Sequence, residues 1–178
     1  MAQHDTKELL LSPRLLTCRI DIKIRQANPE DAHVIAEFNL LLAMESEGLR
    51  LDPACVRPGV AALLADAGKG VYYVADVKGT VAGQLMITYE WSDWRNGDLW
   101  WIQSVYVARE FRRQGVFREL FKHVESLARR HKNVRSLRLY MHVDNSTARR
   151  SYESLGMYRT PYEIFELDFE PSTSQGGS

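Results

Sequence analysis

Residues 100–128 of the chain, WWIQSVYVAREFRRQGVFRELFKHVESLA, contain the pattern on which the fold prediction depends. Aromatic and β-branched residues come first, and they predict a nearly fully buried strand over residues 99–107. Apolar residues then recur at helical spacing and predict an amphipathic helix over residues 115–130. Gly115 lies between the two patterns and lets the backbone come close to a ligand where the helix begins. The stretch therefore predicts a strand, a tight turn and a helix in direct succession.

Charge and backbone geometry at this turn predict an anion-binding site. Arg112, Arg113 and Arg118 surround Gly115. The start of a helix has unpaired N–H groups and carries about half a positive charge, so it attracts anions, and arginine adds donors that match phosphate geometry. The glycine patterns of a P-loop and of a dinucleotide-binding turn are absent. The junction predicts a socket for a phosphate or pyrophosphate; the alternative is a surface turn with solvated arginines.

The distribution of charge agrees with a localised anionic ligand. The chain has 23 basic and 23 acidic residues, so its formal net charge is zero. Residues 109–150, however, contain twelve lysines or arginines and four acids. A nucleic-acid-binding domain is usually basic overall, and we therefore expect no nucleic-acid partner. A solvated helix face is the alternative explanation of the basic segment.

Outside this stretch, periodicity predicts one α/β domain. Alternating apolar residues predict strands over residues 19–27, 71–77, 80–89, 136–142 and 162–169. Apolar residues at helical spacing, with cap and stop residues, predict helices over residues 29–44, 58–67 and 146–155. This order predicts a mixed sheet with helices on its faces. We expect the domain to span residues 18–170, with an N-terminal extension over 1–17 and a flexible tail over 171–178.

Composition excludes several other classes of protein. Of 178 residues, 45% are hydrophobic and 26% are charged, which is typical of globular domains. There is no run of 18 apolar residues, so we expect no membrane-spanning helix. Cys18, Cys55 and the five histidines lack the spacing of metal ligands, so we expect no metal. The first seventeen residues lack a signal-peptide pattern, so we expect a cytoplasmic protein.

Two motifs resemble those of the GNAT N-acetyltransferases. Arg112 and Gly115 match the first two defined positions of the family's [Q/R]-x-x-G-x-[G/A] turn, and Phe117 stands where the family usually has Gly or Ala. Residues 145–158, NSTARRSYESLGMY, resemble the family's N-x-x-A-x-x-x-Y-x-x-x-G-[F/M] block. The two blocks lie about 30 residues apart in the right order, and the resemblance covers roughly residues 20–169. It implies a single GNAT-type domain with a mixed, mostly antiparallel sheet.

The resemblance also implies that acetyl-CoA is the co-substrate. The positions that match the family's cofactor-binding residues are Val105, Tyr106, Val107, Arg112, Arg113, Gln114, Gly115, Val116, Phe117, Arg118 and Asn145. Tyr152 matches the tyrosine that protonates the departing CoA thiolate; a core aromatic is the alternative role. Neither cysteine lies near these motifs, so we expect direct attack on acetyl-CoA in a ternary complex. A non-catalytic acyl-CoA-binding regulatory module is the alternative function.

The general base is less well defined by the sequence. Glu45 and Glu47 follow the first predicted helix, and Glu90 lies at the end of a predicted strand. A carboxylate can remove the amine proton, so each of the three is a candidate, and each has the alternative role of a solvated surface acid. Some GNAT branches carry a glutamate where this chain has Trp100 and Trp101, so that role does not transfer.

Acidic and aromatic residues together predict a cationic acceptor. Residues 44–48 and residues 89–95 place carboxylates next to apolar or indole side chains. Such surroundings suit a cation by charge and by cation–π attraction. We therefore expect a small primary amine or a lysine-containing acceptor. Trp91 and Trp94 are alternatively part of a homodimer interface, because aromatic residues are enriched there.

Overall fold

A five-stranded sheet forms the centre of the protein in the computed structural model, which describes residues 20–167 and residue 169. The strands are β1 (Lys23–Gln26), β2 (Val71–Val77), β3 (Thr80–Ser92), β4 (Gly97–Val107) and β5 (Val134–Arg138), and they lie in that order across the sheet. The first four strands are antiparallel to their neighbours, and β5 is parallel to β4. The predicted mixed, mostly antiparallel sheet is therefore confirmed.

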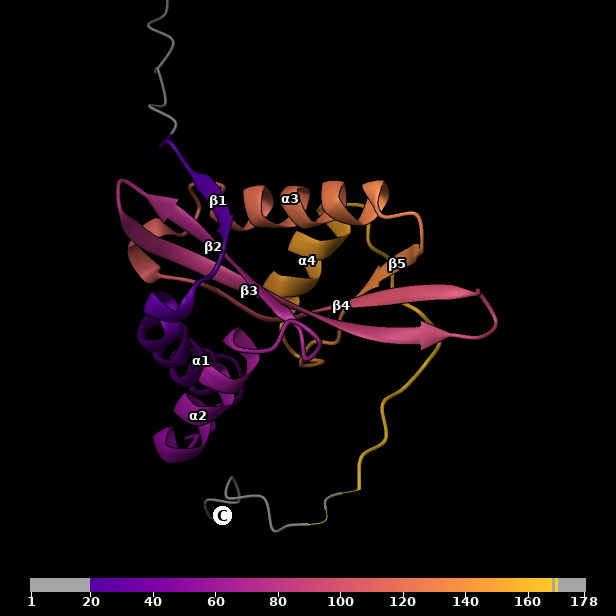
Figure 1. The fold of residues 1–178 in the computed structure, drawn as a ribbon, viewed down its shortest axis with the longest axis horizontal. Helices are drawn as coiled ribbons and strands as arrows, with labels where there is room; N and C mark the ends of the chain where they lie inside the picture. Colours follow the sequence, from indigo (N-terminus) through magenta and orange to yellow (C-terminus); the bar gives the residue numbers. More distant parts are fainter. Residues whose placement is uncertain (1–19, 168, 170–178) are drawn as a thin grey trace, which may run out of the picture.

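Helices cover both faces of this sheet (Figure 1). They are α1 (Ala32–Glu47), α2 (Pro53–Leu64), α3 (Val116–Arg130) and α4 (Ser146–Ser154), with short 3-10 turns at Pro29–Asp31 and Arg109–Phe111. In Figure 1, α1 and α2 lie on one face of the sheet and α3 lies on the other, with α4 beside it. Helix α3 makes the crossover that joins the parallel strands β4 and β5.

Each helix face packs on its own part of the core. Beneath α3, Leu120 and Val124 pack with Leu85 and Ile87 of β3, and all four are at most 1% exposed. On the opposite face, Ile35 and Val60 of α1 and α2 pack with Tyr72 and Val74 of β2. Burial of these apolar surfaces is the main force that holds the helices to the sheet. The sheet therefore separates two helical layers whose ends meet at the site described below.

The 3-10 turn Pro29–Asp31, which leads directly into α1, begins with a well-formed cap. The Asn28 side chain accepts a hydrogen bond from the backbone N–H of Glu30, and the Asp31 carboxylate accepts one from the backbone N–H of Asn28. Asp31 also forms a two-point ion pair with Arg25 of β1 at 2.7 and 2.9 Å. This pairing holds the pKa of Asp31 below its usual value despite partial burial. The predicted helix start is confirmed.

The predicted start of one helix and the last predicted strand are wrong. Helix α2 begins at Pro53 rather than at Pro58, because Asp52 caps it by accepting a hydrogen bond from the N–H of Ala54. The last predicted strand, over 162–169, is absent in its described part, residues 162–167 and 169. Its apolar side chains, such as Ile164 and Phe165, are 65% and 90% exposed. Alternation of apolar residues indicates a face, but a strand also needs a neighbour to pair with.

The sheet opens between β4 and β5. Their pairing runs from Asp98 to Trp101 on β4 and stops at Arg138 on β5, whereas β4 continues to Val107. The predicted strand over 136–142 therefore ends four residues early, because the chain leaves the sheet at this point. The divergence leaves the second half of β4 facing an opening rather than a partner strand.

Some expectations fall outside the described residues or concern membranes. The predicted extension over 1–17 and tail over 171–178 both lie outside them. Over the range that the structure describes, no helix is both long and apolar enough to span a bilayer.

Candidate active site

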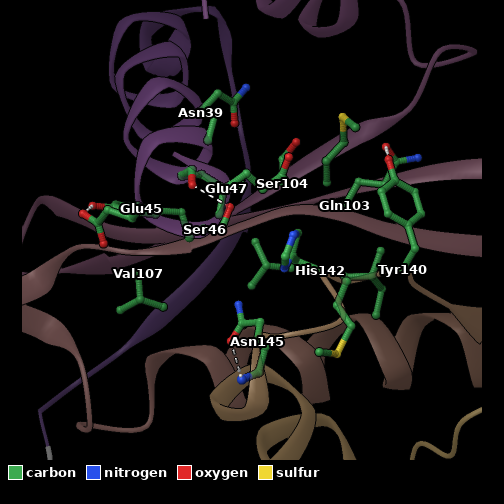
Figure 2. Close-up of a pocket in the computed structure, with 18 of the residues that line it drawn as sticks. Asn39, Glu45, Ser46, Glu47, Gln103, Ser104, Val107, Tyr140, His142 and Asn145 are labelled. Carbon is green, nitrogen blue, oxygen red and sulfur yellow. Dashed lines mark hydrogen bonds between the residues drawn. The ribbon is translucent and has the colours of Figure 1, made fainter. Parts of the chain in front are cut away.

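A cleft of about 910 Å3 lies where β4 and β5 diverge (Figure 2). Its floor is the second half of β4, and two walls rise from it. The α3–α4 wall consists of Arg112, Phe117, Asn145, Thr147, Ala148, Ser151 and Tyr152. The α1–α2 wall consists of Asn39, Leu42, Ala43, Glu45, Ser46, Glu47, Leu49, Leu51, Val56, Gly59, Val60 and Leu63. Segments far apart in the sequence thus form one continuous cleft.

Most of the predicted site residues meet in this cleft. Those that line it are Val105, Tyr106, Val107, Arg112, Phe117, Asn145, Tyr152, Glu45 and Glu47. Arg113, Gln114, Gly115, Val116 and Arg118 lie at the start of α3 and are not part of the lining. Glu90 also lies outside, on the part of β3 that extends with β4 into a long hairpin.

A bulge in β4 shapes the floor of the cleft. Gln84 pairs with Tyr106 and Met86 pairs with Gln103, so Ser104 and Val105 together oppose the single residue between them on β3. Ser104 has a φ of 49°, a left-handed conformation that few non-glycine residues adopt. Bulges of this kind redirect a strand and are common next to active sites. Here the bulge lies at the point where β4 loses β5 as its neighbour.

A buried amide supports the bulge from below. The Gln84 side chain is fully buried, and its Nε2 donates hydrogen bonds to Asn39 Oδ1 at 2.8 Å and to the Ser104 carbonyl at 3.3 Å. Asn39 Nδ2 in turn donates to the Tyr72 hydroxyl at 2.9 Å. The Oε1 of Gln84 has no hydrogen-bond partner among the described residues. The amide network therefore ties α1 and β2 to the backbone of the bulge.

The turn before α3 has the geometry of an anion site. Gly115 has a φ of 89°, and a Cβ at this position would meet nothing within 4 Å. No side chain caps the helix, so the N–H groups of its first turn are left for a ligand. Phe117 points away, because its ring packs edge-on against Tyr152 at 5.6 Å between centroids. A bulky residue at a usually small position is thus accommodated without blocking the turn.

Glu45 ties the end of α1 to this turn. Its Oε1 accepts hydrogen bonds from the Tyr106 hydroxyl and from Arg109 Nε, both at 3.1 Å, and its Oε2 accepts one from Arg112 at 2.7 Å. Arg112 Nε also donates to the Val107 carbonyl at 2.8 Å. Partial burial by itself would raise the pKa of Glu45, but these hydrogen bonds outweigh it and lower the pKa. The carboxylate is held ionised by its partners and is poorly suited to take up a proton.

The other two predicted acids differ in position. Glu47, the last residue of α1, lines the cleft and has an exposed side chain. Glu90 accepts a hydrogen bond from the Trp101 indole and pairs with Arg138 at 3.5 Å. Trp91 and Trp94 are 59% and 90% exposed on the same hairpin. The structure therefore brings Glu47 to the cleft and leaves the hairpin residues outside it.

Two residues of α4 face the cleft from its first and second turns. Asn145 caps the helix, with its Oδ1 accepting from the N–H of Ala148 at 2.9 Å, and its Nδ2 points toward the opening in Figure 2. Tyr152 lies about two turns further on, and burial raises the pKa of its phenol. A phenol is already protonated at neutral pH at its ordinary pKa of about 10, and the shift leaves it so, which allows the hydroxyl to donate a hydrogen bond.

His142 is a cleft residue that sequence reasoning missed. It follows β5, and Figure 2 shows its imidazole reaching into the middle of the cleft. Its Nδ1 accepts from the N–H of Asp144 at 3.4 Å. Tyr140 lies on the same side and donates to Gln103 at 3.4 Å. Both residues lie beyond the end of β5 at Arg138, so the predicted strand alternation over 136–142 does not account for their position in the cleft.

Known proteins and the cleft geometry indicate the same class. Residues 41–157 match the Acetyltransferase (GNAT) family. A crystal structure from Clostridium difficile 630, described as a possible acetyltransferase, is 46% identical to this chain. The match covers 83% of this chain and 97% of that chain, with a TM-score of 0.78. The chain therefore belongs to the GNAT acetyltransferase family, and it is an acetyl-CoA-dependent N-acetyltransferase.

Two more distant structures share the fold. A protein from Clostridium acetobutylicum described as a predicted acetyltransferase with acetyl-CoA is 17% identical, with a TM-score of 0.68 over 83% of this chain and 96% of that chain. The structure of AAC(6')-Iy with the bisubstrate analogue CoA-S-monomethyl-acetylneamine is 16% identical, with a TM-score of 0.66 over 83% of this chain and 98% of that chain. No protein with a curated description matches the chain. Within the described residues, no three His, Cys, Asp or Glu side chains are grouped to hold a metal ion.

Proposed function

We propose that the enzyme transfers the acetyl group of acetyl-CoA to a primary amine by direct attack in a ternary complex. The observation that carries the proposal is one continuous cleft: a turn with uncapped N–H groups adjoins one wall, and the carboxylate of Glu47, which has no ion pair among the described residues, lies on the other. The two substrates can therefore approach the β4 bulge from opposite sides. Direct transfer needs this arrangement, because both reactants must be bound together.

Acetyl-CoA fits the α3–α4 wall. The first-turn N–H groups behind Gly115, with Arg113 and Arg118 beside them, suit the diphosphate. The backbone of Val105–Val107 runs along the cleft where β5 has diverged. Its peptide groups can pair with the amides of the pantetheine arm as a neighbouring strand would. Asn145 Nδ2 adds a side-chain donor on the same path.

The reaction then needs one proton acceptor and one proton donor. An ammonium group must lose a proton before its nitrogen can attack the thioester carbon. As the C–N bond forms and the C–S bond breaks, the CoA thiolate takes a proton from the Tyr152 hydroxyl, and the second amine proton leaves the nitrogen and restores that hydroxyl. The Tyr152 hydroxyl is protonated at neutral pH and its side chain lines the cleft, so it is suited to this role.

His142 and Glu47 have different roles toward the amine. Both line the cleft, and the Glu45 carboxylate is already bound by Arg109 and Arg112. Imidazole is the side chain most often used as a general base, so we assign proton removal to His142. Glu47 attracts the ammonium by charge. Glu45 is a positioning residue, because it acts through Arg112 and the turn.

A thiol-release assay tests the proposal directly. The purified protein is incubated with acetyl-CoA and a panel of primary amines, and free CoA thiol and N-acetylated product are measured. We expect equal amounts of both. Thiol release without any N-acetylated amine, or no turnover with any amine, would overturn the amine-acceptor proposal.

Two variants test the division of roles. His142→Asn should lower kcat about 100-fold with little change in KM for the amine. Glu47→Gln should raise KM for the amine about tenfold and leave KM for acetyl-CoA unchanged. If Glu47→Gln instead lowers kcat 100-fold and His142→Asn does not, Glu47 is the base and the assignment is wrong.

A further inference from the structure

The composition of the α1–α2 wall indicates what kind of amine fits there. Its polar side chains other than Glu45 and Glu47 are Asn39, which is hydrogen-bonded to Tyr72 and Gln84, and Ser46, which donates to the Leu42 carbonyl. Its larger apolar side chains are all aliphatic: Leu42, Leu49, Leu51, Val56, Val60 and Leu63. Val60 is 4% exposed, but Leu51 is 36% exposed, and Leu42 and Leu49 are half-buried. Solvent therefore reaches a contiguous apolar surface inside the cleft. Covering such a surface with an apolar ligand is favourable.

Acidic charge on this wall is scarce. The Glu45 carboxylate is satisfied by two arginines and a tyrosine. The acids elsewhere on α1 and α2 are engaged as well: Glu37 pairs with Arg57 at 3.3 Å, and the Asp52 carboxylate caps α2. Of the carboxylates that line the cleft, Glu47 is left to meet a ligand. The wall offers one negative charge beside a large apolar area.

A polycation would be poorly matched to these surroundings. An aminoglycoside or polyamine carries several ammonium groups, and each one that is desolvated needs an acceptor or an acid. The acidic and aromatic hairpin residues that could have provided further partners for ammonium groups, such as Glu90 and Trp94, lie outside the cleft. The prediction of a cationic acceptor held by carboxylates and indoles together therefore does not describe this wall.

We propose that the acceptor is an amphipathic monoamine: one primary amine on an alkyl or aryl body. The body packs against the aliphatic side chains of the α1–α2 wall, and the ammonium lies at Glu47 beside the β4 bulge. This inference rests on the proposed function and narrows its acceptor. Selectivity among amines then comes mainly from the apolar area that the acceptor buries, because Glu47 provides one charge for one ammonium group.

The first test compares acceptors on the unmodified enzyme. The value of kcat/KM is measured for n-butylamine, n-hexylamine, 2-phenylethylamine, spermidine and neamine at saturating acetyl-CoA. We expect kcat/KM to rise about fourfold for each added methylene group that the wall buries, and hexylamine and phenylethylamine to exceed spermidine and neamine at least tenfold. A polycation as the best acceptor would overturn the inference and leave the proposed function standing. No acetylation of any amine would overturn both.

The second test adds charge to the wall. Leu51→Asp places a second carboxylate at an already exposed position, so the fold should tolerate it. We expect kcat/KM for hexylamine to fall about tenfold and that for spermidine to rise. Leu41→Asp is the matched control, because Leu41 is 44% exposed and does not line the cleft. Equal effects of the two substitutions on the hexylamine-to-spermidine ratio would contradict the proposal.

Discussion

The two walls of the cleft offer different groups to a ligand. The α3–α4 side offers main-chain groups: a left-handed glycine, uncapped N–H groups and the edge of β4 from which β5 has diverged. The α1–α2 side offers mainly aliphatic side chains and the Glu47 carboxylate. Main-chain groups are the same whatever the residue, whereas side chains change with every substitution. A family built this way can keep its acyl donor and exchange its acceptor by altering one wall.

Glu45 is the residue that joins these two regions. It belongs to α1, yet its partners Arg109 and Arg112 belong to the turn on the other side. Together with the Gln84 amide beneath the bulge, it fixes the distance between the walls. Changes on one side can therefore be tested for effects on the other, from the largest expected to the smallest.

Tyr152→Phe should separate chemistry from binding most strongly. Removing the hydroxyl removes the donor to the thiolate, and we expect kcat to fall about 100-fold. The ring that packs on Phe117 is retained, so KM for acetyl-CoA should change less than twofold. Steady-state kinetics at saturating amine measure both values. An unchanged kcat would exclude Tyr152 from the proton transfer.

Gly115→Val tests the main-chain nature of the α3–α4 wall. A β-branched residue at a φ of 89° is strained by about 2 kcal/mol. The backbone of the turn would shift to relieve this strain, and the shift would distort the turn. We expect the Kd for CoA, measured by calorimetry, to rise about 30-fold.

Gly79→Val is the matched control for this substitution. Gly79 has a φ of 84° with open space around it, but it lies in the turn between β2 and β3. The control should lower the Tm by a similar amount and leave CoA binding unchanged. Equal loss of CoA affinity in both variants would mean that general destabilisation, and not the turn, explains the effect.

Glu45→Gln should loosen the connection between the walls in a pH-dependent way. Because the folded-state pKa of Glu45 is lowered from 4.5, its ion pairs contribute stability above that value and lose it as the pH falls through the folded-state pKa. At pH 7 we expect a loss of about 1 kcal/mol, or about 3 °C in Tm, and KM for acetyl-CoA a few-fold higher. The difference in Tm from the parent protein should shrink below pH 4. A constant difference from pH 7 to pH 3 would argue against the ion-pair explanation.

Trp94→Ala should have the smallest effect. Its side chain is 90% exposed at the end of the β3–β4 hairpin and does not line the cleft. We expect kinetic constants for both substrates within twofold of the parent values. A large rise in KM for the amine would show that the hairpin takes part in acceptor binding, and the contrast between the walls would then be incomplete.

Local patterns explain why one wall was predictable from sequence. The turn at Gly115 and the block that contains Asn145 and Tyr152 are each continuous in the chain, so their spacing alone indicates what they form. The role of Glu45 depends on a contact with Arg112 across 67 residues, which no local pattern contains. The aliphatic wall looks like ordinary core in the sequence, since Val60 and Leu63 follow the same helical spacing as buried residues.

The errors in the fold prediction have a similar origin. The sequence pattern predicts a helix start at Pro58, but the Asp52 cap begins α2 five residues earlier, at Pro53. The alternation over 162–169 resembles a strand, but exposure of Phe165 and its neighbours depends on whether another strand is present to pair with. Short-range pattern predicts what a segment can form, and tertiary partners decide whether it does.

The Oε1 atom of Gln84, which has no hydrogen-bond partner among the described residues, has an evolutionary consequence. A buried acceptor without a partner costs about 1–3 kcal/mol of stability. A leucine or methionine at this position would fill the same space without that cost. Asn39 and the Ser104 carbonyl border the cleft, so water could replace the lost donor. Selection for thermal stability alone should therefore replace Gln84 early. The more stable variants should have a lower kcat, because the bulge at Ser104 would have lost its hydrogen bond from Gln84.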